Sequence, residues 1–284
     1  MQLSPEQFRY TPGTSLAQYA SQWGPLKDAR ETLQTTIEEL SDLQEKLYAD
    51  DRRSLLLVFQ GMDAAGKDST IKHVTSGVNP MGFQVFNFKQ PTYKELDHNY
   101  LWRFWRAMPE RGRIGIFNRS YYEEVLVVRV HPEMLEARRL PHDTVDDRFW
   151  QRRYDDIRNM EAHLAENGMT ILKFFLNVSK SEQRARLLSR LHESKKHWKF
   201  DPRDLDERDN WDAYQDAYAR AIAATHTDRA PWFVIPADDK WTMRAIVARI
   251  VTDAIASLDI SWPEPNHDGA VIADAIRRLE SEPD

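Results

Sequence analysis

The stretch from Leu55 to His73, "LLLVFQGMDAAGKDSTIKH", decides the fold of this chain. It begins as an apolar run, passes through a turn bracketed by Gly61 and Gly66, and continues as a helical pattern that carries Lys67. The spacing is G-x-x-x-x-G-K, which is typical of a phosphate-binding loop when a strand precedes it and a helix follows. Both conditions are met here. The stretch therefore predicts a site for an oligophosphate.

The physical reason is that this kind of loop concentrates positive potential. Glycine permits backbone angles that turn successive N–H groups inward, the following helix adds its positive end, and the lysine adds a point charge. The alternative is a turn whose glycines serve packing only, which the strand and helix context disfavours. We expect the following residues to contact phosphate: Gly61, Ala64, Ala65, Gly66, Lys67, Asp68 and Ser69.

Asp68 stands where most such loops have the Ser or Thr that ligates magnesium, so the sequence predicts a metal ligand elsewhere. Asp63 lies inside the loop, where a carboxylate would repel phosphate unless a divalent cation lay between them. Asp63 is therefore the first candidate ligand for Mg²⁺, and capping of the loop N–H groups is its alternative role. Asp68 is expected to cap the start of the helix, where negative charge is favoured.

Five short apolar runs have strand character, and stretches with helical character lie between them. The strands are predicted at residues 55–60, 83–88, 114–117, 170–178 and 232–236. Helices are predicted at 95–108, 144–166 and 204–224, and a helical pair is predicted within 16–50. Strands joined by helices need crossover connections, so we expect an α/β fold with a mainly parallel sheet covered on both faces.

The third predicted strand ends in "RIGIFNRSYYEEV", residues 113–125. Ligands bind beyond the carboxyl ends of parallel strands, so Asn118, Arg119 and Glu123 are expected at the same edge as the loop. Arg119 suits phosphoryl oxygens, although a salt-bridge role is about as common at such a position. Asn118 replaces the Asp that such a strand normally presents to magnesium, and Glu123 is a second candidate metal ligand. Asn118 and Glu123 are also candidates for nucleotide contact.

Composition bounds the class of protein. With 284 residues and 41% hydrophobic content, the chain can bury one sizeable core. Cysteine is absent, which excludes disulfides and thiolate metal sites and fits a reducing compartment. Residues 1–19 lack a secretory pattern, and no apolar run approaches the roughly 20 residues that span a bilayer.

We expect a cytoplasmic protein without a membrane partner. A net charge of -6 argues against nucleic acid as a partner.

One stretch, residues 184–203, is basic within this acidic chain; we call it the basic island. Its cations are Arg184, Arg186, Arg190, Lys195, Lys196, Lys199 and Arg203, against Glu193 and Asp201. Runs of charge are ordinarily solvated helix faces. The residues alone leave that interpretation open beside a role in binding a polyanion.

Taken together, these motifs resemble the second family of polyphosphate kinases, which transfer phosphoryl groups between inorganic polyphosphate and nucleotides. The resemblance covers about residues 16–258. It rests on "GMDAAGKDS" at Gly61, "FKQPT" at Phe88, "YLWRFWRAMPERGRIGIFNRSYYEEV" from Tyr100, "SEQRARLLSRLHESKKHWKFDPRDLDERDNWDAY" from Ser181 and "APWFVIPADDKWTMR" from Ala230. The order and combination of these motifs are far more specific than the loop alone.

The resemblance implies a P-loop kinase-like three-layer fold with a five-stranded sheet. It also implies a lid at about 180–210 within a phosphotransferase domain at 51–260. The helical spacing before residue 50 predicts a helical extension at 1–50, and Pro263, Pro265 and the polar last residues predict a mobile tail at 261–284. The resemblance also implies Mg²⁺ as cofactor and a homo-oligomer. The "NRSYYEEV" segment resembles the subgroup that phosphorylates both AMP and ADP; adenine nucleotides are the expected partners, and guanine nucleotides stay open.

The same resemblance implies roles for individual residues. Asp63, Lys67 and Arg119 are the catalytic candidates: Lys67 grips the phosphates, magnesium bridges them to Asp63, and Arg119 stabilises the transferring group. Arg186 and Arg190 match lid arginines that hold polyphosphate. Many members have Asp at the position of Asn118 and Asn at that of Glu123, which leaves the second metal ligand unassigned.

Two alternatives remain beside a polyphosphate-dependent reaction. One is an ATP-dependent nucleotide kinase of the thymidylate-kinase type, which would use the same loop. The other is a noncatalytic module that binds a polyanion or RNA, which would not need the loop lysine.

Overall fold

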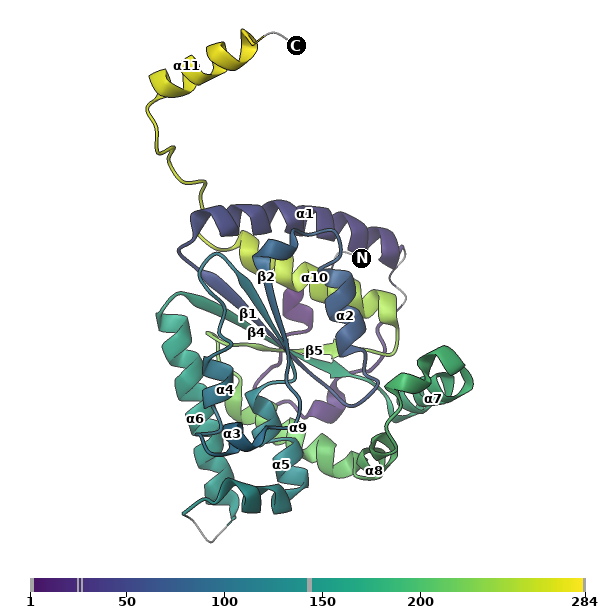
Figure 1. Ribbon diagram of the computed structural model, residues 1–284. Helices are drawn as coiled ribbons and strands as arrows, with labels where there is room; N and C mark the ends of the chain where they lie inside the picture. Colours follow the sequence, from purple (N-terminus) through teal and green to yellow (C-terminus); the bar gives the residue numbers. More distant parts are fainter. Residues whose placement is uncertain (1–2, 25, 27, 142–144, 283–284) are drawn as a thin grey trace.

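The computed structural model describes residues 3–24, 26, 28–141 and 145–282, and within them a parallel five-stranded sheet forms the centre of the protein (Figure 1). Its strands are β1 (Ser54–Gln60), β2 (Phe83–Asn87), β3 (Ile114–Asn118), β4 (Met169–Asn177) and β5 (Trp232–Pro236). Their order across the sheet is β2-β3-β1-β4-β5. The predicted α/β class and all five predicted strands are confirmed.

The central strand is β1, which explains its unbroken apolar run. Every residue of β1 is buried, because β3 and β4 flank it and helices cover both faces of the sheet. Phe59 pairs with Asn118 of β3 and with Phe174 of β4, so these strands end at one edge of the sheet. This common edge brings the phosphate-binding loop and the residues after β3 together.

Two helical layers cover the sheet, as Figure 1 shows. One layer contains α1 (Ala29–Asp50), α2 (Lys67–Val74) and α10 (Lys240–Ala256), and the other contains α6 (Asp147–Glu166) and α9 (Trp211–Thr225). Helix α1 packs along α10 and buries Leu33, Ile37, Leu40 and Leu47, the apolar positions that recur at helical spacing in the sequence.

The chain before α1 does not form the first half of the predicted helical pair. It contains two 3₁₀ helices, η1 (Pro5–Gln7) and η2 (Leu16–Gln18), and pairs with β5 between them: Tyr10 N donates to Trp232 O at 2.8 Å, and Val234 N donates to Phe8 O at 2.8 Å. The segment thereby covers part of the β5 edge, an arrangement that blocks pairing with other chains.

The helix predicted at 95–108 is broken in the structure into α3 (Tyr93–Leu96) and α4 (Trp102–Trp105). Asn99 causes the break, because its side-chain oxygen accepts from Leu101 N at 2.9 Å and forms a local turn in place of helical hydrogen bonds. Trp105, at the end of α4, stays 42% exposed.

Short elements connect the remaining strands. They are η3 (Pro80–Gly82), η4 (Tyr121–Glu124), α5 (Val127–Val130) and η5 (Pro132–Arg138). The helix predicted at 144–166 begins at Asp147, where Asp146 accepts from Phe149 N at 2.8 Å as an N-cap, and Thr144 lies outside the described residues.

The basic island lies in α7 (Lys180–His192) and η6 (Ser194–Lys199), and its last cation begins α8 (Arg203–Asp209). These elements project from the carboxyl edge of the sheet, where the predicted lid would be (Figure 1). The helix predicted at 204–224 is divided at Asn210 into α8 and α9.

The predicted tail contains a helix that the sequence analysis missed, α11 (Gly269–Glu280). It stands away from the body of the protein, and none of its residues is buried (Figure 1). Among the described residues, no helix is long and apolar enough to cross a bilayer.

Candidate active site

The predicted phosphate-binding loop lies between the end of β1 and the start of α2, at the carboxyl edge of the sheet. Gly66 has φ = 111°, a backbone angle that favours glycine, and a Cβ atom there would lie 3.1 Å from Met243 Cε of α10, close enough that the methionine would have to shift. Ala64 has φ = 61°, an uncommon conformation for a residue with a Cβ atom. The loop is therefore held in a shape that the chain would not adopt by itself.

Lys67 points back into this loop. Its Nζ donates to Gly61 O at 2.5 Å and to Met62 O at 3.3 Å, and the residue is only 9% exposed. Burial lowers the pKa of Lys67, and the nearby Arg119 lowers it further, while the Asp63 carboxylate opposes the shift. Two backbone carbonyls thus hold the Lys67 ammonium group inside the loop, where its charge can attract an anion.

Arg119 lies between two carboxylates. Its guanidinium is 2.9 Å from Asp63 Oδ1 and 3.7 Å from Glu123 Oε2. The charge of Glu123 raises the pKa of Arg119, burial opposes this, and Asp63 adds to the increase. Arg119 also has φ = 62°, in a left-handed conformation that costs energy outside glycine. The strained turn directly after β3 carries the arginine to the loop.

Glu123 is held in place by Gln60, a residue that the sequence analysis missed. With its amide oriented so that both of its polar atoms are satisfied, Gln60 donates to Glu123 Oε1 at 2.9 Å and accepts from Ser120 Oγ at 3.0 Å. Burial raises the pKa of Glu123, whereas Arg119 and Lys67 lower it. The sequence signal for Gln60 was its polar side chain at the end of a strand that is otherwise almost entirely apolar.

Asp68 lies in the first turn of α2, where negative charge is favoured, but the prediction that it caps the helix was wrong. The N-cap residue is Gly66, and the Asp68 carboxylate instead accepts a hydrogen bond from Asn118 Nδ2 at 2.6 Å. Asn118 is buried, and its Oδ1 has no hydrogen-bond partner among the described residues. Most such sites have a hydroxyl at the start of the helix and a carboxylate at the end of the strand. Here the carboxylate, Asp68, lies on the helix, and the neutral oxygen, of Asn118, lies at the end of the strand.

These residues fit a magnesium ion that is held largely by substrate. No group of three or more His, Asp or Glu side chains converges on one point among the described residues, so an all-protein cage is absent there. Mg²⁺ at phosphoryl-transfer sites usually takes one or two carboxylates, phosphate oxygens and water. Asp63 and Glu123 supply such carboxylates, and the unpartnered Oδ1 of Asn118 is a hard oxygen of the type that Mg²⁺ or its water accepts.

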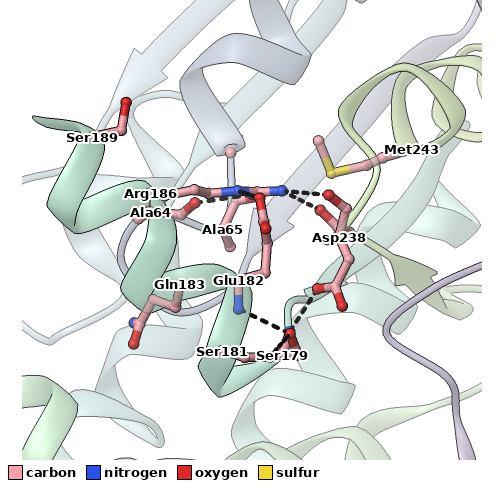
Figure 2. A network of polar contacts seen from close by, with 12 residues as sticks. Ala64, Ala65, Ser179, Ser181, Glu182, Gln183, Arg186, Ser189, Asp238 and Met243 are labelled. Atoms are coloured by element: carbon pink, nitrogen blue, oxygen red, sulfur yellow. Dashed lines mark hydrogen bonds and ion pairs between the residues drawn. The ribbon is translucent and has the colours of Figure 1, made fainter.

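Arg186, a residue of the basic island, is buried beneath the loop (Figure 2). Its Nε donates to Glu182 Oε1 at 2.7 Å, and its other four donor contacts reach backbone carbonyls. These are Ala64 O at 3.0 Å, Ala65 O at 2.8 Å, Ala237 O at 2.6 Å and Asp238 O at 3.0 Å. One guanidinium therefore ties the loop to the segment between β5 and α10, with each of its five N–H groups matched to an oxygen.

Gln183 extends this contact by one residue. Its Nε2 donates to Asp63 O at 3.0 Å, and its Oε1 accepts from Arg208 of α8 at 2.6 Å. Helix α7 thus binds the carbonyls of three successive loop residues. With these carbonyls turned toward α7, the N–H groups of the loop are favoured on the opposite side, where an anion would bind. The sequence analysis missed Gln183, and its three-residue spacing from Arg186 was the signal that both share a face.

Arg190 has a different partner. Its Nη1 lies 3.2 Å from Asp204 Oδ2, so it connects α7 to α8 within the lid. Burial raises the pKa of Asp204, and the Asp63 charge contributes, whereas Arg190 lowers it. The predicted contact of Arg186 and Arg190 with polyphosphate stays a prediction; both side chains here bind protein oxygens.

Comparison with known proteins places these residues in a family. The sequence profile described as Polyphosphate kinase 2 (PPK2) matches residues 26–262. The chain is 49% identical over 271 residues to an ADP-polyphosphate phosphotransferase of Rhodopseudomonas palustris, covering 93% of this chain and 94% of that protein. It is 46% identical over 242 residues to an AMP/ADP-polyphosphate phosphotransferase of Meiothermus ruber, with 85% and 86% covered.

A solved structure is also similar over nearly the whole chain. The crystal structure of Polyphosphate Kinase 2 from Arthrobacter aurescens TC1 superimposes with a TM-score of 0.89 at 39% identity, covering 98% of this chain and 97% of that one. The predicted P-loop kinase-like fold is thereby confirmed.

Proposed function

Because this chain belongs to the polyphosphate kinase 2 family, it is a polyphosphate-dependent nucleotide phosphotransferase, and we propose that it transfers phosphoryl groups from inorganic polyphosphate to ADP and to AMP. The observation that carries the proposal is the loop, whose backbone surrounds the buried Lys67 and whose Asp63 contacts Arg119 at 2.9 Å. The reaction is reversible in principle.

The residues act mainly by position and charge, because phosphoryl transfer passes through a loose transition state. The loop N–H groups and Lys67 bind the oxygens of the terminal phosphates. Arg119 leaves its carboxylate partners for the equatorial oxygens of the transferring group, where its fixed donors neutralise the developing charge.

When bound, Mg²⁺ supplies charge neutralisation between the phosphate oxygens and the carboxylates. Asp63 and Glu123 would hold it, and the amide oxygen of Asn118 would bind it or one of its waters. Asp68 keeps the Asn118 side chain oriented through the hydrogen bond at 2.6 Å.

The names of relatives support the choice of acceptor nucleotide. The position of α7, η6 and α8 supports their role as a lid. One relative's name covers ADP and another's covers both AMP and ADP, and the "NRSYYEEV" segment supports the second pattern. The elements α7, η6 and α8 stand beside the loop, where they exclude water that would compete with the nucleotide.

The experiment is a product analysis with purified protein and Mg²⁺. Long-chain polyphosphate is supplied with ADP or AMP in turn, and ATP is supplied as the donor in parallel. We expect ATP from ADP, and ADP followed by ATP from AMP, with polyphosphate as the effective donor. Transfer from ATP alone would identify an ordinary nucleotide kinase, and binding of polyphosphate without turnover would identify a noncatalytic module.

A further inference from the structure

A buried polar network joins the sheet to α6 and begins two residues after Arg119. Its centre is an ion pair in which Lys173 Nζ of β4 donates to Glu161 Oε2 of α6 at 2.6 Å. The other oxygen of this carboxylate, Oε1, accepts from the hydroxyls of Tyr121 at 2.8 Å and Tyr122 at 2.9 Å. We call Tyr121, Tyr122, Glu161 and Lys173 the η4 network, because both tyrosines belong to η4.

The groups at the centre of the network are satisfied by protein partners. Lys173 Nζ also donates to the Tyr122 hydroxyl at 3.0 Å and to Thr225 O of α9 at 2.8 Å, so each of its three N–H groups has an acceptor. Thr225 Oγ1 lies 2.9 Å from the Tyr122 hydroxyl and accepts from Trp232 Nε1 of β5 at 2.9 Å. Each of these residues is at most 1% exposed.

Stability alone does not account for charged groups at this place. The desolvation of a buried lysine and glutamate offsets most of their attraction, and apolar side chains of similar size are often as stabilising. A fully satisfied polar network does, however, specify one arrangement of the elements that it joins. Here these elements are η4, β4, α6, α9 and β5.

The element that borders the active site is η4. Tyr121 and Tyr122 are its first two residues, and Glu124, its last, is buried in ion pairs with two arginines. Glu123 is the η4 residue that contacts the site, at 3.7 Å from Arg119. The body of the protein thus holds three of the four residues of η4, while the remaining one contacts Arg119.

Arg119 needs this support because its backbone is strained. Its φ of 62° is uncommon for a residue with a Cβ atom and persists only where the surrounding structure imposes it. On the side of β3, Arg119 N donates to Phe59 O of β1 at 3.2 Å. On the other side, Ser120 Oγ accepts from Tyr122 N at 3.2 Å, and the tyrosine hydroxyls hold η4 to Glu161. The strained residue therefore lies between two anchored segments.

We propose that the η4 network positions Arg119 for the transfer step, by fixing the turn that presents its guanidinium to the transferring phosphoryl group. The inference rests on the proposed function and adds positioning residues to it. Arg119 acts on charge that develops in the transition state, and a displacement of about 1 Å at such a group can lower a rate about a hundredfold. Loss of the network should therefore lower kcat, while the KM values for polyphosphate and ADP stay unchanged.

The test is a double-mutant cycle with Arg119→Gln. The first network variant combines Lys173→Met with Glu161→Leu, which removes the ion pair and the acceptor of both tyrosines. The second combines Lys173→Met with Glu161→Gln, which removes the charges but keeps a carbonyl oxygen for the tyrosine hydroxyls. Each is made in the unmodified protein and in Arg119→Gln, and kcat, KM and the thermal midpoint are measured.

The control is Leu47→Ala, at a fully buried position of α1. This helix lies on the opposite face of the sheet from α6 and α9 (Figure 1). The substitution leaves a cavity and lowers the thermal midpoint without changing the η4 network. Below its thermal midpoint the control should keep the kcat of the unmodified protein.

We expect the variant with Glu161→Leu to lower kcat about tenfold with both KM values unchanged, and the variant with Glu161→Gln to recover most of this loss. In Arg119→Gln the same substitutions should lower kcat no further, because no arginine is left to position. An equal loss of kcat in both backgrounds, a rise in KM, no loss of kcat, or a similar loss in the control would each overturn the positioning role.

A further variant covers the case in which Lys173→Met with Glu161→Leu does not fold. Tyr121→Phe removes a single hydroxyl from the carboxylate and takes its place in the cycle, with an expected loss of kcat of about threefold. Failure of the proposed function gives a different result: the unmodified protein would transfer phosphate from ATP and not from polyphosphate. The same cycle measured with ATP would then still decide whether the network positions Arg119.

Discussion

Arg186 in α7 and Lys195 in η6 both belong to the basic island, but their environments differ in the structure. In α7, Arg186 is buried and donates to five oxygens of the protein. In η6, the Lys195 side chain is 83% exposed and its nearest carboxylate, on Glu193, is 3.9 Å away. Lys199 is exposed as well. A cation whose donors are all occupied shapes the protein, whereas an exposed cation remains available to a polyanion.

The difference teaches how to separate the two roles experimentally. Removing Arg186 leaves loop carbonyls without partners, so the loop should lose its shape and the protein should lose stability. Removing an exposed lysine leaves nothing unsatisfied, so only substrate binding can respond. Loss of Arg186 should lower stability and kcat, whereas loss of an exposed lysine should change only the KM for the polyanion.

Lys67→Ala should cause the largest loss of activity, because it removes the cation of the loop that α7 contacts. We expect kcat to fall at least about a hundredfold to a thousandfold, as when a preorganised charge at a transition state is removed. Circular dichroism should show an unchanged fold. Near-normal turnover would contradict the assignment of the loop as the donor site.

Arg186→Gln should have the next largest effect and tests the comparison directly. We expect kcat to fall about a hundredfold and the free energy of unfolding to fall by about 3 kcal/mol, since buried carbonyls and Glu182 lose their partner. Urea denaturation and steady-state kinetics measure the two quantities. The sequence-based role, contact with the polymer, predicts instead a higher KM for polyphosphate at normal stability, so this variant distinguishes the roles.

Asp63→Asn tests whether the phosphate-binding loop supplies a ligand for Mg²⁺. The backbone of Asp63 is held by Gln183 and its side chain by Arg119, so the substitution changes charge with little change of shape. We expect the Mg²⁺ concentration for half-maximal rate to rise about tenfold, because a neutral amide is a poorer ligand for a hard cation. An unchanged magnesium titration would return Asp63 to a loop-capping role.

The double variant Lys195→Gln, Lys199→Gln probes the exposed lysines of the island. We expect the KM for long-chain polyphosphate to rise about threefold and to depend less steeply on salt, because two phosphate-neutralising charges are gone. The thermal midpoint should match that of the unmodified protein. A loss of stability comparable to that of Arg186→Gln would abolish the distinction between the buried Arg186 and these exposed lysines.

The smallest expected effect is a pH dependence where the lid meets the body. His131 Nε2 lies 2.9 Å from Glu207 Oε2 of α8; burial alone would lower the pKa of His131, but the hydrogen bond and charge of Glu207, with Glu133, raise it above its usual value. A raised histidine pKa stabilises the folded protein fully below the unfolded value of about 6.5, and the gain is lost as pH rises through the folded value.

The gain should be under about 1 kcal/mol because the pair is partly exposed to solvent. Thermal midpoints measured between acidic and mildly alkaline pH should therefore converge for the unmodified protein and His131→Gln as pH rises. A difference between them that stays constant with pH would show that the imidazole contributes by packing alone.

Much of the fold was predictable because its signals are local. The apolar run of β1, the glycines of the loop and the helical spacing of α1 each lie within a few residues, and the structure confirms these elements. Breaks in helices were missed where a single side chain, such as Asn99, competes with the backbone. Helix α11 was missed because the prolines and the polar last residues predicted a mobile tail.

The sequence by itself determined the α/β architecture, the phosphate-binding loop and the family, since each depends on the order of residues along the chain. Only the tertiary structure decided which cations face inward. Arg186 reaches Ala64 across 122 residues of sequence, and Asn118 reaches Asp68 across 50. Burial and hydrogen-bond partners arise when such distant segments meet, so no spacing or charge count within residues 184–203 could separate a cation that shapes the loop from one that is free to bind substrate.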